Sequence, residues 1–117
     1  MTGAASFHAG LAAEDQVARH YARSGHTILA RRWRGRSGEI DLVFQDEQHG
    51  FLFVEVKHAR DHTRAAERLS ARQLQRIRRS SEEFLATATT GDAAEARIDL
   101  ALVDGRGAIS VIENISL

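Results

Sequence analysis

The sequence predicts an α/β fold in which helices flank a mixed β-sheet. Three observations support this class: a helical pattern of apolar residues near the start, three strand-like runs after it, and a second helical stretch before two more strand-like runs. The expected order is therefore αβββαββ. The chain of 117 residues fits a single domain, 1–117, and it contains no cysteine, so disulfides and thiolate metal sites are not expected.

The first expected element is a helix over residues 9–24. Leu11, Val17 and Tyr21 can form one apolar stripe along it, and Gly25 suits the position just after a helix end. The other elements follow from alternating or helical patterns of apolar residues. They are strands at 26–33, 38–44 and 51–57, a helix at about 64–88, and strands at 97–103 and 108–115.

The second and third strands are expected to form a hairpin, because residues 46–50 have the composition of a turn. On the second strand, alternation places Ile40, Leu42 and Phe44 on one face. Asp41 is then expected on the opposite face.

On the third strand, Glu55 and Lys57 are two residues apart, so their side chains share a face. Pairing across the short turn can bring Asp41 to them. Carboxylate oxygens suit Mg²⁺ or Mn²⁺, which also bind phosphate oxygens. These residue types therefore predict divalent-metal chemistry on a phosphate group, with Lys57 orienting water or neutralising developing charge.

The alternative is a structural ion pair in which Glu55 and Lys57 only satisfy each other. Lysine usage argues against it, because the chain has fifteen arginines and a single lysine, Lys57. Lysine is a compact point charge that can lose its proton when buried, whereas arginine cannot. Its presence at this one position favours a chemical role.

The net charge of zero hides a polarised distribution. From Lys57 to Arg79 there are eight basic and two acidic residues, a local charge of +6. Arginines recur there every four residues with few acids between them, which favours phosphate binding over a solvated helix face. A second basic group surrounds Trp33, which is expected in the core rather than stacked on a base. Glu82, Glu83, Asp92 and Glu95 are expected on the solvated surface.

Two segments, GEIDLV at 38–43 and FVEVK at 53–57, carry a specific pattern. Together they resemble the YraN family of small bacterial proteins, a branch of the PD-(D/E)XK nuclease superfamily similar to archaeal Holliday junction resolvases. The resemblance covers about residues 10–114 and implies a restriction-endonuclease-like αβββαβ core. Two positions depart from it: Ala13 stands where the family usually has Gly, and Gln73 where a Lys is common.

By this resemblance, Asp41 and Glu55 are expected to be metal ligands and Lys57 the catalytic lysine. Glu14, on the first helix, would complete the metal site, and Glu39 is the motif glutamate counted with the catalytic residues. The residues expected to contact nucleic acid are Arg34, Arg36, Arg60, Arg64, Arg68, Arg72, Gln73 and Arg76.

The predicted function is metal-dependent, endonuclease-type hydrolysis of phosphodiesters in DNA, branched or single-stranded, with Mg²⁺ or Mn²⁺ as cofactor. One alternative is a nucleic-acid-binding module of the same fold without independent cleavage activity. Another is a structural or interaction protein whose carboxylates form only ion pairs.

Asp99 matches a recurrent aspartate of the family that the sequence resembles.

DNA is expected as the partner rather than RNA, and the resemblance also allows a homodimer. The sequence shows neither a signal-peptide pattern nor an apolar run that could span a membrane, so a cytoplasmic location is expected.

Overall fold

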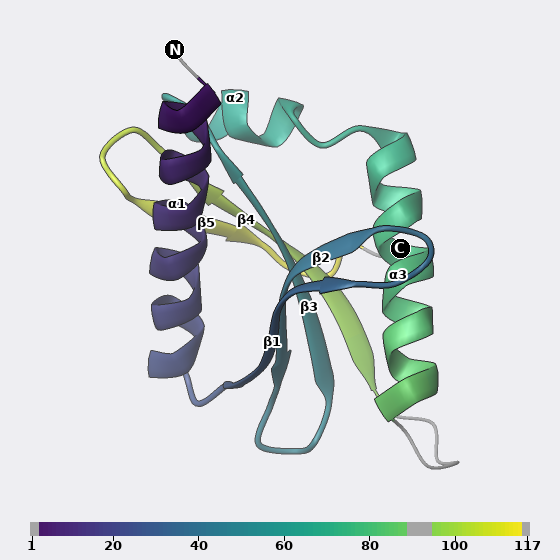
Figure 1. The fold of residues 1–117 in the computed structure, drawn as a ribbon. Coiled ribbons are helices and arrows are strands. Elements are labelled where there is room, and N and C mark those ends of the chain that lie inside the picture. Colours follow the sequence, from purple (N-terminus) through teal and green to yellow (C-terminus); the bar gives the residue numbers. More distant parts are fainter. Residues whose placement is uncertain (1–2, 89–94, 116–117) are drawn as a thin grey trace.

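The computed structural model describes residues 3–88 and 95–115, which form three layers (Figure 1). The first helix covers one face of a central sheet, and the other two helices cover the opposite face. The elements are α1 (Gly3–Arg23), β1 (Thr27–Arg34), β2 (Glu39–Gln45), β3 (Phe51–His58), α2 (His62–Glu67), α3 (Ala71–Ala88), β4 (Ala96–Val103) and β5 (Ile109–Ile112).

The sheet is mixed and its strand order is β1-β2-β3-β4-β5. β1, β2 and β3 pair antiparallel, β3 and β4 pair parallel, and β5 returns antiparallel to β4. A parallel pair requires a crossover connection, and the segment containing α2 and α3 supplies it. The predicted α/β class with a mixed sheet flanked by helices is confirmed.

The helix α1 packs on the sheet through small and apolar side chains. Val17 and Tyr21 are buried there, as the predicted stripe requires, but Leu11 is 37% exposed, so its place in the stripe is wrong. The helix begins at Gly3, earlier than predicted. It ends at Arg23, and Gly25 follows the helix end as expected, with a φ of 86° in the left-handed region that glycine adopts without a steric penalty.

The alternation predicted for β2 fails at one residue. Leu42 and Val54 pack on the α1 side of the sheet, while Val43 and Phe53 pack on the α3 side. Ile40 was expected beside Leu42, but it lies in the α3 layer with Val43. The regular β2–β3 ladder ends at the Leu42–Val54 pair, and beyond this point the backbone no longer follows the two-residue period.

The single helix predicted at 64–88 is two helices, so this prediction is wrong. α2 ends at Glu67 and α3 begins at Ala71. Ser70 starts the second helix, because its Oγ accepts a hydrogen bond of 3.1 Å from the N–H of Gln73. The four-residue spacing of the arginines therefore does not produce one continuous stripe.

The remaining expectations agree with the structure in part. The last strand is shorter than predicted and ends at Ile112. Trp33 packs edge-to-face on Phe84 with ring centroids 5.3 Å apart, which confirms its predicted core position. Asp92 lies outside the described residues. In the part of the chain that is described, no helix has the length and apolar character needed to cross a membrane.

Candidate active site

Asp41 lies where β2 and β3 stop pairing regularly. Leu42 and Val54 are the last paired residues of the two strands at this end. Beyond them, the N–H of Val56 donates a hydrogen bond of 2.8 Å to Asp41 Oδ2. A side chain thus takes the place of a ladder bond, and this contact holds the carboxylate between the separating strands.

Glu55 lies between Val54 and Val56 on β3 and is almost fully buried. Its Oε1 lies 3.4 Å from Nζ of Lys57. The same oxygen accepts a hydrogen bond of 3.3 Å from Nε2 of Gln73 on α3. The carboxyl group of Asp41 lies beside that of Glu55, close enough for the ionisation of the two groups to be linked. The three side chains that the sequence predicted to converge therefore do lie together.

The two carboxyl groups are short of compensating positive charge. Burial raises the pKa of Asp41, although the N–H of Val56 acts in the opposite direction. Burial also raises the pKa of Glu55, and the neighbouring Asp41 adds to this effect. Two carboxyl groups this close repel each other when both are charged, and a bound proton or a cation relieves that repulsion. The donor set therefore fits a hard divalent cation such as Mg²⁺ or Mn²⁺.

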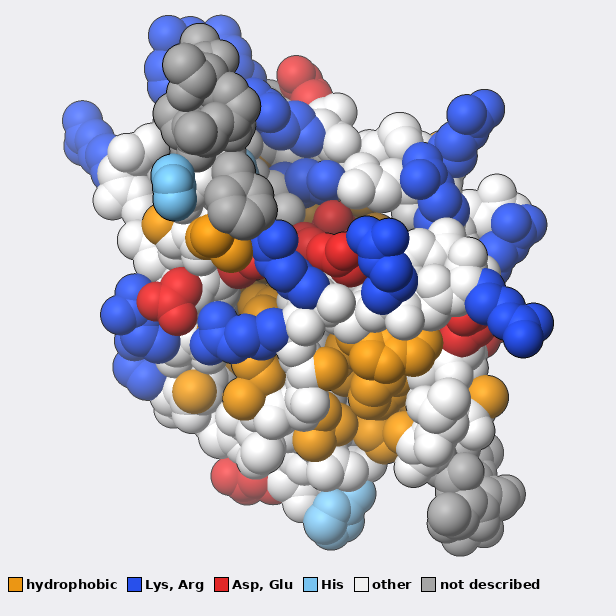
Figure 2. Space-filling view, viewed as in Figure 1, with side chains coloured by type: hydrophobic (Ala, Val, Ile, Leu, Met, Phe, Trp, Pro, Cys, Tyr) orange, Lys and Arg blue, Asp and Glu red, His pale blue; other side chains and the backbone are white. Residues whose placement is uncertain are grey.

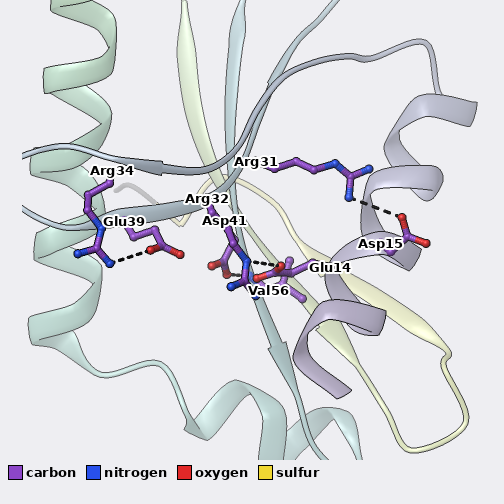
Figure 3. A network of polar contacts seen from close by, with 8 residues as sticks. All are labelled: Glu14, Asp15, Arg31, Arg32, Arg34, Glu39, Asp41 and Val56. Carbon is purple, nitrogen blue, oxygen red and sulfur yellow. Dashed lines mark hydrogen bonds and ion pairs between the residues drawn. The ribbon is translucent and has the colours of Figure 1, made fainter. Parts of the chain in front are cut away.

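An arginine that was not expected at this site already lies beside these carboxylates. Arg32 Nε donates a hydrogen bond of 3.0 Å to Glu14 Oε2. Figure 3 shows the Arg32 side chain reaching from β1 toward both Glu14 and Asp41. The hydrogen bond to Glu14, together with the charges of Glu14, Glu39 and Asp41, raises the pKa of Arg32.

The backbone of Arg32 is unusual as well. Its φ is 50°, in the left-handed region that costs a residue other than glycine about 1–3 kcal/mol. Such a conformation persists only where surrounding contacts hold it, and the ion pair with Glu14 is one of them. No local sequence pattern signals this backbone conformation, which explains why the residue was missed.

Glu14 is turned toward Arg32 and is not joined to the Asp41–Glu55 pair by a hydrogen bond. In residues 3–88 and 95–115, no group of three or more His, Cys, Asp or Glu side chains is arranged to hold a metal ion. Burial raises the pKa of Glu14, and the hydrogen bond from Arg32 opposes this. Glu14, which the sequence predicted as the third ligand, therefore lines the site, but its carboxylate is paired with Arg32.

One cleft, with a volume of about 700 Å³, is lined by Glu14, Glu39, Asp41 and Glu55. Figure 2 shows acidic side chains at the centre of this face, with Lys and Arg side chains on both sides of them. Beyond the carboxylates, the cleft is lined by Lys57, His58, Arg68, Gln73 and Arg76. A phosphate group could therefore approach the carboxylates between cationic side chains.

The residues predicted to contact nucleic acid divide into two groups. Arg68, Gln73 and Arg76 line the cleft. Arg34 forms an ion pair of 3.1 Å with Glu39, a cleft residue on the neighbouring strand (Figure 3). The predicted residues that do not line this cleft are Arg34, Arg36, Arg60, Arg64 and Arg72.

Glu83 was expected on the solvated surface, and it lies there half-exposed, but its carboxylate has partners that the sequence did not indicate. Its carboxylate accepts hydrogen bonds from the hydroxyl of Ser37 and from the backbone N–H groups of Ser37, at 2.9 Å, and Arg36, at 2.7 Å. These hydrogen bonds, that of the Ser37 hydroxyl first, lower the pKa of Glu83. They fasten the β1–β2 turn to α3, over which the turn curls in Figure 1, and so place Gly38 and Glu39 at the cleft.

Asp99 is fully buried and does not line the cleft. It accepts hydrogen bonds from the hydroxyl of Tyr21 at 2.8 Å and from the N–H of Asn114 at 3.0 Å. It also forms an ion pair with Arg97 at 3.1 Å. Asp99 therefore joins α1, β4 and the segment after β5, which is a structural role.

The fold and the cleft define an α/β domain in which the half-buried Asp41 and the buried Glu55 lie beside a lysine. A model described as uncharacterised protein family UPF0102 matches residues 13–103. A UPF0102 protein of Cereibacter sphaeroides is 49% identical over 114 residues, covering 97% of each chain. One of Ruegeria pomeroyi is 49% identical over 106 residues, covering 91% of this chain and 85% of its own. The chain belongs to the UPF0102 family, which is YraN-like, as the sequence predicted.

Among solved structures, the complex described as EndoMS with dsDNA2 is similar with a TM-score of 0.40 and 18% sequence identity. The match covers 63% of this chain and 26% of that chain, so the matched part of the present chain corresponds to about a quarter of that chain's length.

Proposed function

We propose that this chain is a single nuclease-type domain that hydrolyses phosphodiester bonds in DNA with the help of Mg²⁺ or Mn²⁺. The observation that carries the proposal is the carboxyl pair of the half-buried Asp41 and the buried Glu55, which shares a cleft with the only lysine of the chain. Buried carboxylates are costly unless a cation or proton compensates them. In a cleft with cationic walls, this cost is most simply explained by binding of a metal and a phosphate.

In this proposal Asp41 and Glu55 hold the metal, and Glu14 joins them when it leaves Arg32. The bound ion would supply a Lewis acid for the phosphate and would lower the pKa of a water molecule. The N–H of Val56 keeps the carboxylate of Asp41 oriented, and Gln73 does the same for Glu55. These neighbours fix the ligands in advance, which limits the reorganisation needed on binding.

Lys57 has a separate task in the proposed reaction. Its ammonium group lies 3.4 Å from Glu55, and its side chain is 18% exposed, so it can reach both the carboxylate pair and the cleft. From there it can orient the attacking water or neutralise charge that develops on the phosphate. Arg68 and Arg76 on the cleft wall would bind the flanking phosphates of the DNA strand.

A second candidate function is a nucleic-acid-binding module of the same fold that does not cut alone. The observation that favours it is the Glu14–Arg32 ion pair, which keeps the third acidic side chain from the carboxylate pair. If this arrangement persists in solution with metal and DNA, the cleft would bind a phosphate without completing the metal site.

The test is cleavage of labelled single-stranded, duplex and four-way-junction DNA with Mg²⁺ or Mn²⁺. Wild type is compared with Asp41→Asn, Lys57→Met and the exposed charge control Glu82→Gln. We expect metal-dependent cutting by wild type and Glu82→Gln and none by the two cleft variants. Salt-dependent DNA binding without cutting of any substrate would establish the second candidate instead.

A further inference from the structure

A second cleft adjoins the proposed active site. Its volume is about 730 Å³, and it lies between α1 and the turn that connects β4 with β5. His58 and Arg68 line both this cleft and the first one, so the two are neighbours. The proposed reaction uses no residue that belongs to the second cleft alone.

The charge of the second cleft is predominantly positive. Arg60, Arg68 and Arg106 line it, and within the described residues none of the three forms an ion pair. Its one acidic side chain, Asp104, accepts hydrogen bonds of 2.9 Å from the N–H groups of Arg106 and Ala108. The Asp104 carboxylate is therefore occupied by hydrogen bonds within the turn. The guanidinium groups remain available to bind an anionic ligand.

The walls of the second cleft leave room for a chain-like ligand. The α1 wall presents Ala9, Ala12 and Ala13 beside Gln16, and the opposite turn presents Gly105 and Gly107. Residues without long side chains permit close approach of a ligand backbone. A volume of about 730 Å³ is that of an ordinary small-ligand pocket, so this cleft cannot enclose duplex DNA. It can hold a short length of a single strand.

We infer that a single polynucleotide strand runs from the acidic cleft past His58 and Arg68 into the second cleft, where Arg60 and Arg106 bind its phosphates. This inference rests on the proposed function, because it assigns the first cleft to the cleaved phosphate. The preferred substrate then carries an unpaired extension next to the bond that is cut. The β4–β5 turn and α1, which are far apart in sequence, together form the walls of this strand path.

The inference is tested by binding of DNA hairpins with unpaired extensions of zero, two, four and eight nucleotides, on either end, without divalent metal. The double variant Arg60→Ala with Arg106→Ala is compared with Arg23→Ala with Arg79→Ala, which removes the same charge at exposed positions outside both clefts. Fluorescence anisotropy over a range of salt concentrations gives the affinity and its salt dependence.

We expect wild type and the control to bind more tightly as the extension on one end grows. In the cleft variant this gain should disappear, and the slope of log affinity against log salt should fall by about 1.4 for two lost single-strand phosphate contacts. A third variant, Ala12→Phe, narrows the cleft without changing the charge and should also lose the gain. Circular dichroism establishes that each variant is folded.

Three outcomes are distinguishable. Loss of the extension-dependent gain in the cleft variants alone supports the strand path. Equal binding by the cleft and control variants, with wild type still binding DNA, overturns the strand path and leaves the proposed function intact. Failure of wild type to bind any hairpin at low salt overturns both.

Discussion

The hydroxyl of Tyr21 donates a hydrogen bond of 2.8 Å to the carboxylate of Asp99 across 78 residues of sequence, and both side chains are buried. Tyr21→Phe removes this donor and leaves the carboxylate with Arg97 and the N–H of Asn114. We expect a loss of about 1–2 kcal/mol in the free energy of unfolding, measured by urea denaturation. The activity of the folded fraction should not change, and a selective loss of activity would contradict the structural role.

Glu83 should make stability depend on acidity. Its pKa is lowered in the folded protein, so its contribution is complete above the unfolded value of about 4.3 and is lost as the pH falls through the folded value. Wild type should exceed Glu83→Gln in stability by a constant amount near neutral pH. The difference should shrink below about pH 4, because both chains then carry an uncharged side chain at this position.

The measurement is the unfolding midpoint of wild type and Glu83→Gln between acidic and neutral pH. Glu82→Gln is the matched control, because Glu82 is the preceding residue of α3 and is exposed. If the stability of wild type relative to Glu83→Gln increased toward acidic pH, the change would be opposite to the expected one and would contradict the prediction.

Glu55 should not stabilise the metal-free protein. Its burial and its nearness to Asp41 both raise its pKa, which means that the folded state disfavours its charged form. Glu55→Gln keeps the shape of the side chain and removes the cost of burying a carboxylate charge, although it also weakens the contact with Lys57. In the presence of a metal chelator, the free energy of unfolding of the variant should lie within about 1 kcal/mol of the wild-type value or above it. A loss above about 2 kcal/mol would show that Glu55 is primarily structural.

Arg32 should have opposite effects on the two proposed ligands. Removing it frees Glu14 from a charge-assisted hydrogen bond, so Arg32→Ala should bind Mn²⁺ about three- to tenfold more tightly. The same variant should bind DNA more weakly, because a guanidinium beside the cleft is lost.

Arg31→Ala is the matched control for this prediction, since Arg31 pairs at 3.6 Å with the exposed Asp15. Calorimetric titration with Mn²⁺ and anisotropy with labelled DNA provide the two readouts. Weaker Mn²⁺ binding by Arg32→Ala would mean that the arginine supports the metal site instead of competing with the metal.

The sequence was sufficient to predict the core of the candidate site. A two-residue period on β3 places Glu55 and Lys57 together, and a short turn brings Asp41 to them. The same reasoning failed at Ile40, because the contact between Asp41 and Val56 ends the regular ladder there. Periodicity describes regular pairing, and an interruption of pairing depends on contacts that only the folded chain makes.

The break between α2 and α3 had a local signal that was not used. Ser70 and Gln73 have the spacing of a helix-starting capping pair, and Ser70 does cap α3. No proline or glycine lies between residues 64 and 88, so the uninterrupted helical pattern outweighed that signal. The roles of Arg32 and Glu83 had no such signal, since each depends on a partner distant in sequence.

The central claim is that Asp41 and Glu55 together hold a divalent cation, and direct titration with Mn²⁺ tests it. Isothermal calorimetry on wild type, Asp41→Asn and Glu82→Gln compares the loss of one carboxylate at the site with the loss of one at the surface. We expect saturable binding by wild type and Glu82→Gln and at least about tenfold weaker binding by Asp41→Asn. Absence of binding to wild type at millimolar Mn²⁺, or equal binding by Asp41→Asn, would contradict the account.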